Sequence, residues 1–245
     1  MPVRVRPLEC GWLTTDLGTM LSGRIGEFSM PVGAFLVEHE RGTVVFDTGM
    51  HPDLVHGSGR LGPIESMFDV HLDAANLLGA RLGRCDVDPA DVDVAVLSHL
   101  HYDHCGGLVE VPDCRVVVQH DEWTAAQDPV LAELGVYHPA DFDTGHEVEL
   151  LEGRHDLFGD GAVVAVPTPG HTAGHQSLLI EGRLLLVGDA CYCQLALDED
   201  ALPPIAADVE RQRAGFAWLR QQAASGVQLV YSHDPVQWPT LAAVL

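Results

Sequence analysis

Short apolar runs separated by turns dominate the first half of the chain. Residues 34–37 (Ala-Phe-Leu-Val) and 43–46 (Thr-Val-Val-Phe) flank a polar segment that ends at Gly42. Two runs of this kind, joined by a short loop with a glycine, predict a β-hairpin. Near-continuous apolar runs over residues 92–97 and 114–118 predict further, buried strands.

The second half repeats the pattern. Apolar runs over residues 162–166, 177–180, 183–187 and 227–231 predict four more strands. The segment Ile180-Glu-Gly-Arg183 joins two of these runs and predicts a second hairpin.

Two segments have the spacing of amphipathic helices. Residues 73–82 predict a helix with Asp73 as its N-cap and Gly83 as its stop. Residues 207–224 predict a second helix. Its buried side would carry Val209, Phe216, Trp218 and Leu219. Two groups of strands mixed with helices predict the α/β class, as an αββα sandwich of two mixed β-sheets flanked by helices. We expect residues 1–245 to form a single domain.

Charge and composition narrow the function. The chain has 13 basic and 36 acidic residues, with a formal net charge of −23. Binding nucleic acid or an anionic membrane requires clustered Lys and Arg, so we expect neither partner. We find no signal peptide pattern and no run as long as a membrane span. The six cysteines form no C-x-x-C pair. We therefore expect a cytoplasmic protein with reduced thiols.

The densest group of metal-ligand types is Ser98-His-Leu-His-Tyr-Asp-His-Cys-Gly-Gly107, directly after an apolar run. Residues two apart in an extended segment point the same way, so His99 and His101 can hold one ion. Asp103 and His104 can then face a second position nearby. Imidazole and carboxylate ligands without thiolate suit zinc, although manganese, cobalt or iron could occupy such a site.

Three more candidate ligands follow predicted strands. His171 comes after the run 162–166 and a turn, Asp189 after the run 183–187, and His233 after the run 227–231. Side chains at the carboxyl ends of strands commonly build the site of an open sheet. We therefore add these three residues to the metal-binding set.

The motif His99-x-His101-x-Asp103-His104, followed by His171, Asp189 and His233, resembles the metal motifs of the metallo-β-lactamase superfamily. The segment Asp47-Thr-Gly49 is also typical of it. Within the superfamily, residues 46–50, 98–104, 168–177 and 189–192 resemble N-acyl-homoserine lactonases, the quorum-quenching enzymes. The resemblance extends from Ala34 to His233.

The resemblance implies a cofactor of two Zn²⁺ ions per chain and a catalytic role for Tyr192. His99, His101 and His171 would hold one ion, and Asp103, His104 and His233 the other. Asp189 would bridge them. A hydroxide between the ions would attack the lactone carbonyl. Tyr192 would stabilise the oxyanion, and Asp103 would pass a proton to the leaving ring oxygen.

The substrate contacts are expected from the loop 51–68 and from Tyr102. Met67 and Phe68 would line an apolar channel for the acyl chain, and Tyr102 would pack beside the lactone ring. Relatives often pair, so we expect a homodimer.

Other hydrolases of the same fold remain alternatives, namely a lactonase for a different ring, such as a pyridoxolactone, and a glyoxalase-II-like thioesterase. The thioesterase is disfavoured because residues 214–245 contain a single basic residue, Arg220. A β-lactamase is disfavoured by the missing export signal, and a nuclease by the acidic charge.

Overall fold

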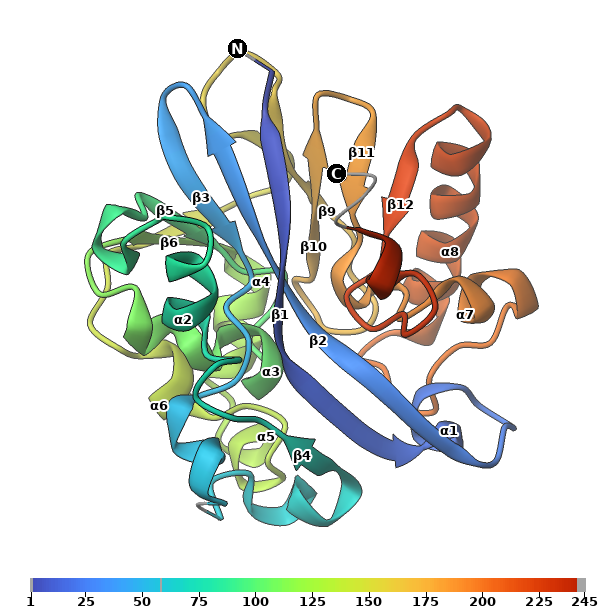
Figure 1. The fold of residues 1–245 in the computed structure, drawn as a ribbon. Coiled ribbons are helices and arrows are strands. Elements are labelled where there is room, and N and C mark those ends of the chain that lie inside the picture. The colour runs from blue at the N-terminus through green and yellow to red at the C-terminus, as the bar shows by residue number, and fades with distance from the viewer. Residues whose placement is uncertain (1, 58, 242–245) are drawn as a thin grey trace.

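The computed structural model describes residues 2–57 and 59–241 of the chain. Two mixed β-sheets lie face to face with helices outside them (Figure 1). The first sheet has the order β4-β1-β2-β3-β5-β6-β7 and the second the order β12-β11-β10-β9-β8. The predicted αββα sandwich is therefore confirmed.

The strands of the first sheet are β1 (Arg4–Asp16), β2 (Glu27–His39), β3 (Gly42–Phe46), β4 (Asp69–His71), β5 (Val94–Val96), β6 (Arg115–Gln119) and β7 (Val148–Leu151). Those of the second sheet are β8 (His155–Asp156), β9 (Val163–Pro167), β10 (Gln176–Ile180), β11 (Leu184–Leu186) and β12 (Gln228–Val230). The helices are α1 (Leu17–Met20), α2 (Leu78–Gly83), α3 (Tyr102–Cys105), α4 (His120–Ala126), α5 (Pro129–Glu133), α6 (Pro139–Phe142), α7 (Gln194–Glu199) and α8 (Val209–Ala224).

Alternation along the strands divides the core into two layers. Val44 and Phe46 of β3 point between the sheets and pack with Leu178 and Leu186 of the second sheet. Val45 belongs to the other apolar cluster, which includes residues of α2 and α8. Because successive strand residues face opposite sides, a continuous apolar run fills both layers. Both predicted hairpins are present, as β2–β3 and β10–β11.

The predicted helix over residues 73–82 is shorter than expected. Helix α2 covers Leu78–Gly83, and Leu77 before it is extended. The side chain of Asp73 accepts a hydrogen bond from the Ala75 amide at 2.7 Å. Asp73 therefore caps a turn rather than the helix, which is a common alternative use of an Asp side chain. Gly83 is the last helical residue instead of the stop beyond it.

Helix α8 confirms part of its prediction. Phe216 and Leu219 are buried and Trp218 packs against the same core, but Val209 is 48 % exposed. Gln212 is buried on the inner side instead, because the loop before His171 packs on it. Among the described residues, none of the helices has the length and apolar character that crossing a bilayer requires.

Candidate metal centre

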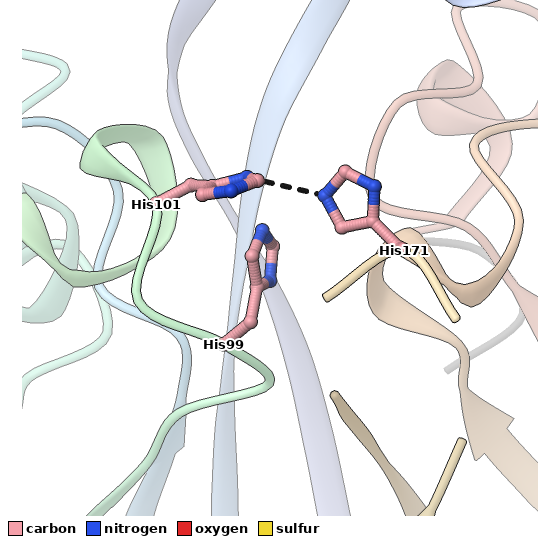
Figure 2. A group of neighbouring side chains, drawn as sticks. All are labelled: His99, His101 and His171. Atoms are coloured by element: carbon pink, nitrogen blue, oxygen red, sulfur yellow. Dashed lines mark hydrogen bonds between the residues drawn. The ribbon is translucent and has the colours of Figure 1, made fainter. Parts of the chain in front are cut away.

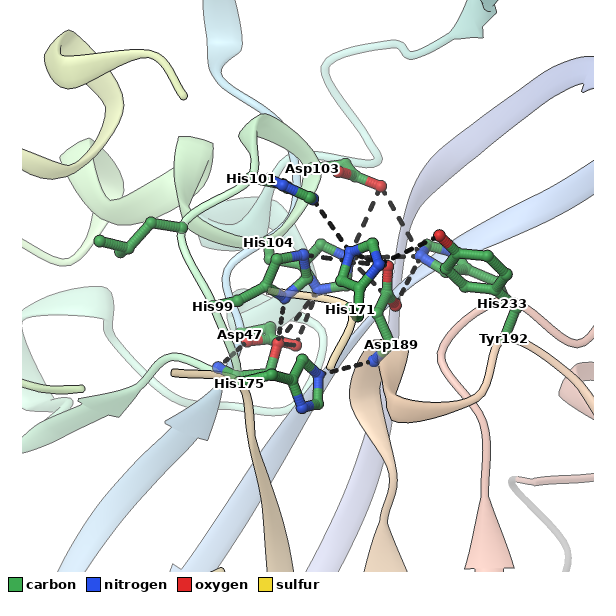
Figure 3. Close-up of polar contacts among 12 residues, drawn as sticks. Asp47, His99, His101, Asp103, His104, His171, His175, Asp189, Tyr192 and His233 are labelled. Atoms are coloured by element: carbon green, nitrogen blue, oxygen red, sulfur yellow. Dashed lines mark hydrogen bonds and ion pairs between the residues drawn. The ribbon is translucent and has the colours of Figure 1, made fainter. Parts of the chain in front are cut away.

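The candidate ligands lie beyond the carboxyl ends of strands in both sheets. His99 follows β5, and Asp189 and His233 follow β11 and β12, which pair in parallel. His171 follows β9. Strands that run parallel end at the same edge of their sheet. The ligand segments of the two sheets therefore meet where the carboxyl ends of these strands lie close together. Figure 3 shows the imidazole rings converging on Asp189.

Among the described residues, potential ligand atoms form three groups, each within 4.8 Å. The first contains His99, His101 and His171, which Figure 2 shows together. The second contains His99, His104 and Asp189, and the third contains Asp103, His104 and His233. All seven residues singled out in the sequence thus occur in these groups.

The carboxylate of Asp189 faces both sides of the cluster. Its Oδ1 lies 3.1 Å from His233 Nε2 and 3.4 Å from His104 Nε2. Its Oδ2 lies 3.4 Å from His171 Nε2 and 3.9 Å from His99 Nε2. One oxygen is therefore directed to each set of histidines, which is the arrangement of a bridging carboxylate.

The outer ring nitrogens meet protein acceptors. His233 Nδ1 lies 2.7 Å from the carbonyl oxygen of Pro31, which can only accept, so this nitrogen carries the proton. His104 Nδ1 lies 2.9 Å from Asp47 Oδ2. These contacts leave the Nε2 atoms of both rings facing the cluster, as in metal-binding histidines.

Two buried polar atoms that face the other ligand atoms lack a hydrogen-bond partner among the described residues. They are Nε2 of His99 and Oδ1 of Asp189. Buried polar atoms are ordinarily paired, because an unpaired one loses its hydration without compensation. An imidazole nitrogen and a carboxylate oxygen that face the other ligand atoms without a partner fit bound metal cations.

The histidines on the two sides of the cluster have pKa values shifted in opposite directions. Burial lowers the pKa of His101 to about 4, and burial lowers that of His99 and His171 well below the usual value. Burial opposes charge on His104 as well, yet the carboxylates of Asp189, Asp103 and Asp47 raise its pKa well above 6.5. The two sides of the cluster thus differ in negative charge density.

Asp103 and Tyr192 stand at the rim of the cluster. Asp103 Oδ2 lies 3.6 Å from His104 Nε2 and 3.7 Å from His233 Nε2. The Tyr192 hydroxyl lies 3.3 Å from His171 Nδ1. Burial, reinforced by the Asp189 and Asp103 carboxylates, raises the pKa of Tyr192 well above its usual value. Tyr192 therefore remains a hydrogen-bond donor at neutral pH.

A cavity of about 340 Å³ opens beside the cluster. Tyr102, Met67 and Phe68, the expected substrate contacts, all line it together with Asp103 and Tyr192. The remaining wall comes from segments that the sequence did not single out. It includes Met20, Met30, Leu131, Val136, Tyr137, Ile205 and Ala206. In the loop 51–68, Leu54 and Leu61 are buried in the core instead.

Sequence reasoning missed several partners of the cluster. The Pro31 carbonyl and Glu122 carry no local signal, because their partners lie far away in sequence. Glu122 is fully buried, and it accepts hydrogen bonds from Leu100, Gly174 and Tyr137. His175 Nε2 accepts the Asp189 amide proton at 2.9 Å.

The sequence matches a known family model and is similar to proteins of known activity. The model of the metallo-β-lactamase superfamily matches residues 30–213. The N-acyl homoserine lactonase AttM of Azorhizobium caulinodans is 32 % identical over 251 residues, which cover 97 % of this chain and 95 % of that protein. The N-acyl homoserine lactonase AiiA of Bacillus thuringiensis subsp. kurstaki is 28 % identical over 215 residues, covering 84 % and 82 %.

A solved structure agrees over nearly the whole chain. It is an N-acyl homoserine lactone hydrolase with the product N-hexanoyl-L-homoserine bound at its catalytic metal centre. The TM-score is 0.86 at 26 % sequence identity, and the match covers 98 % of this chain and 97 % of the other.

Proposed function

This chain belongs to the metallo-β-lactamase superfamily, and on that premise we propose that it opens the ring of N-acyl-homoserine lactones with two zinc ions. The observation that carries the proposal is the convergence of seven metal-ligand side chains beside an apolar cavity. The names of the relatives support the choice of lactone.

The proposed metal sites follow the geometry of the cluster. His99, His101 and His171 would hold one zinc ion, and Asp103, His104 and His233 the other. Asp189 would bridge the ions, because each of its oxygens faces a different set of histidines. When bound, the pair would lower the pKa of a water molecule to near neutrality and polarise the lactone carbonyl.

The chain's own residues supply the remaining chemistry. Tyr192 would donate its hydroxyl proton in a hydrogen bond to the carbonyl oxygen as negative charge develops there. Asp103, which lines the cavity, would take up the proton that the attacking water loses and pass it to the ring oxygen as that oxygen leaves. The product would be the ring-opened N-acyl homoserine, a hydroxy acid.

The cavity would accept the rest of the substrate. Its lining is mainly apolar, which suits an acyl chain. Met67 and Phe68 would contact that chain, while Tyr102, adjacent to the ligand Asp103, would lie against the lactone ring. We place the reaction in the cytoplasm, which accords with six free cysteines.

A panel of substrates tests the proposal. The zinc-loaded protein is assayed with N-acyl-homoserine lactones of several chain lengths, a pyridoxolactone, a glutathione thioester and a β-lactam. We expect the highest kcat/KM for an acyl-homoserine lactone, with loss of turnover in Asp189→Ala. Faster hydrolysis of the thioester or of the other lactone would replace the proposed substrate, and activity without bound metal would refute the mechanism.

A further inference from the structure

We infer that Glu122 is a positioning residue that holds the two histidine-bearing loops of one metal site at their working separation. The inference rests on the proposed function, because it assigns Glu122 to the site formed by His99, His101 and His171.

The carboxylate of Glu122 joins three segments of the molecule. Its Oε1 accepts the Leu100 amide proton at 3.1 Å and the Tyr137 hydroxyl proton at 3.1 Å. Its Oε2 accepts the Gly174 amide proton at 3.0 Å. Leu100 follows β5 of the first sheet, and Gly174 precedes β10 of the second. One side chain at the start of α4 thus connects the two halves of the sandwich.

The bonded residues are adjacent to metal ligands in the sequence. Leu100 lies between His99 and His101, so its amide sets the path of the backbone that carries both rings. Gly174 lies in the loop of His171. The contact that this geometry controls is close, since His101 Nδ1 lies 3.1 Å from His171 Nε2.

Tyr137 extends the same connection to the cavity wall. Its ring centroid lies 5.5 Å from that of His101, and the residue lines the cavity. The hydrogen bond to Glu122 therefore holds an aromatic ring beside His101 at an interplanar angle of 47°. Backbone and ring contacts together restrain this histidine from two directions.

The backbone at Gly174 is in tight contact with helix α4. A Cβ atom at this position would lie 2.1 Å from the Glu122 amide nitrogen. The loop of His171 therefore rests directly on the first turn of α4. A carboxylate is suited to such a place, because its two oxygens can accept hydrogen bonds from separate loops at once. Burial raises the pKa of Glu122, and the amides of Leu100 and Gly174 oppose that rise.

The hydrogen bonds of Glu122 among the described residues reach one side of the cluster. None of its hydrogen bonds described here involves Asp103, His104 or His233. Loss of the carboxylate should therefore weaken one metal site and spare the other. A residue that merely supports the fold would change overall stability without this selectivity.

Glu122→Gln tests the inference with little change of shape, because its amide group would face a backbone N–H that needs an acceptor. The two zinc dissociation constants are measured by competition with a chromophoric chelator, without any lactone. We expect one constant to rise at least tenfold and the other to stay within about twofold. With a lactone substrate, kcat should fall more than KM rises. Asp156→Asn is the matched control, because Asp156 also accepts three backbone N–H groups but lies away from the cluster.

Glu122→Asp provides a second route if the first variant does not fold, since the shorter side chain keeps its charge but cannot reach both loops. Equal weakening of both sites, or unchanged zinc constants with only a lower melting temperature, overturns the inference. Wild-type protein that binds two zinc ions but hydrolyses no lactone defeats the proposed substrate alone. Wild-type protein that binds no zinc pair defeats both proposals.

Discussion

The carboxylate of Asp47 orients the imidazole rings of His104 and, through Ser98, of His99. Its Oδ2 accepts from His104 Nδ1 and from the Ser98 hydroxyl, each at 2.9 Å. The Ser98 oxygen in turn lies 2.9 Å from His99 Nδ1. A fully buried aspartate thus directs two imidazoles whose inner nitrogens face the metal space. Its φ of 59° is one that Asp and Asn tolerate better than most residues.

Replacing Asp47 by Asn should test the orienting role of the carboxylate alone, because Asn also tolerates the positive φ of this position. We expect zinc affinity to fall about 10- to 100-fold, because the amide accepts the His104 proton more weakly than the carboxylate does. Chelator competition measures the change. Asp86→Asn is the control, since Asp86 has a φ of 60° and lies exposed. Similar zinc affinity in both variants would contradict the orienting role.

Tyr192→Phe removes a hydroxyl and keeps the ring. We expect kcat for the lactone to fall about 100-fold while bound zinc stays constant, because the donor acts mainly in the transition state. Steady-state kinetics and elemental analysis of the same preparation check this. A wild-type kcat would exclude Tyr192 from the reaction.

At the scale of elements, the loop that carries His171 packs against α8. Gly170 has a φ of +145°, and a Cβ atom there would lie 2.4 Å from the Gln212 amide nitrogen. Asp208 and Ala207, just before the helix, donate their amide protons to the carbonyl oxygens of Gly170 and His171. The placement of His171 therefore depends on how α8 sits on the second sheet.

Gly170→Ala should push this loop away from α8. We expect the free energy of unfolding to fall by about 3 kcal/mol, which is the upper range for a single backbone clash. Chemical denaturation of the metal-free protein measures it. Gly145→Ala is the control, because Gly145 also has a positive φ but has open space around its Cβ position. It should cost about 1 kcal/mol. Equal losses in both variants would show that the clash is relieved locally.

Long antiparallel pairing accounts for an element that the sequence pattern did not predict. Strand β1 contains Arg4, Arg6 and Pro7 and has a register shift between Glu9 and Trp12, so it lacks a clear alternation. It pairs with β2 along its length, and Arg6 bonds Glu38 at 2.9 Å. Cross-strand contacts of this kind stabilise a strand whose own residues lack the alternation that would predict it.

At the scale of the whole molecule, the metal ligands connect both sheets. Zinc that binds the folded protein and not the unfolded chain stabilises the fold by mass action. At a free zinc concentration about 1,000 times Kd, this contribution is about 4 kcal/mol per site. We expect excess chelator to lower the Tm by several degrees and added zinc to restore it, as calorimetry can measure. An unchanged Tm would mean that metal does not bind at the centre.

Three expectations about the whole molecule stay predictions. We propose that residues 1–245 form one domain, because the apolar cluster between the sheets contains residues from Val3 to Leu241. The homodimer also remains a proposal. The charge of −23 remains our reason for expecting no nucleic acid or anionic membrane partner.

Features that depend on local geometry could be predicted from the order of the residues alone. Strand residues alternate sides and ligands follow strand ends, so the apolar runs and the spacing of His99, His101, Asp103 and His104 were sufficient to predict two sheets and a metal centre. Tertiary structure decided the contacts between distant segments. Pro31 meets His233, and Glu122 meets both Leu100 and Gly174, only after the sheets pack. A hydrogen bond between residues far apart in the chain has no local propensity to reveal it, because its energy depends on the packing that brings its two atoms together.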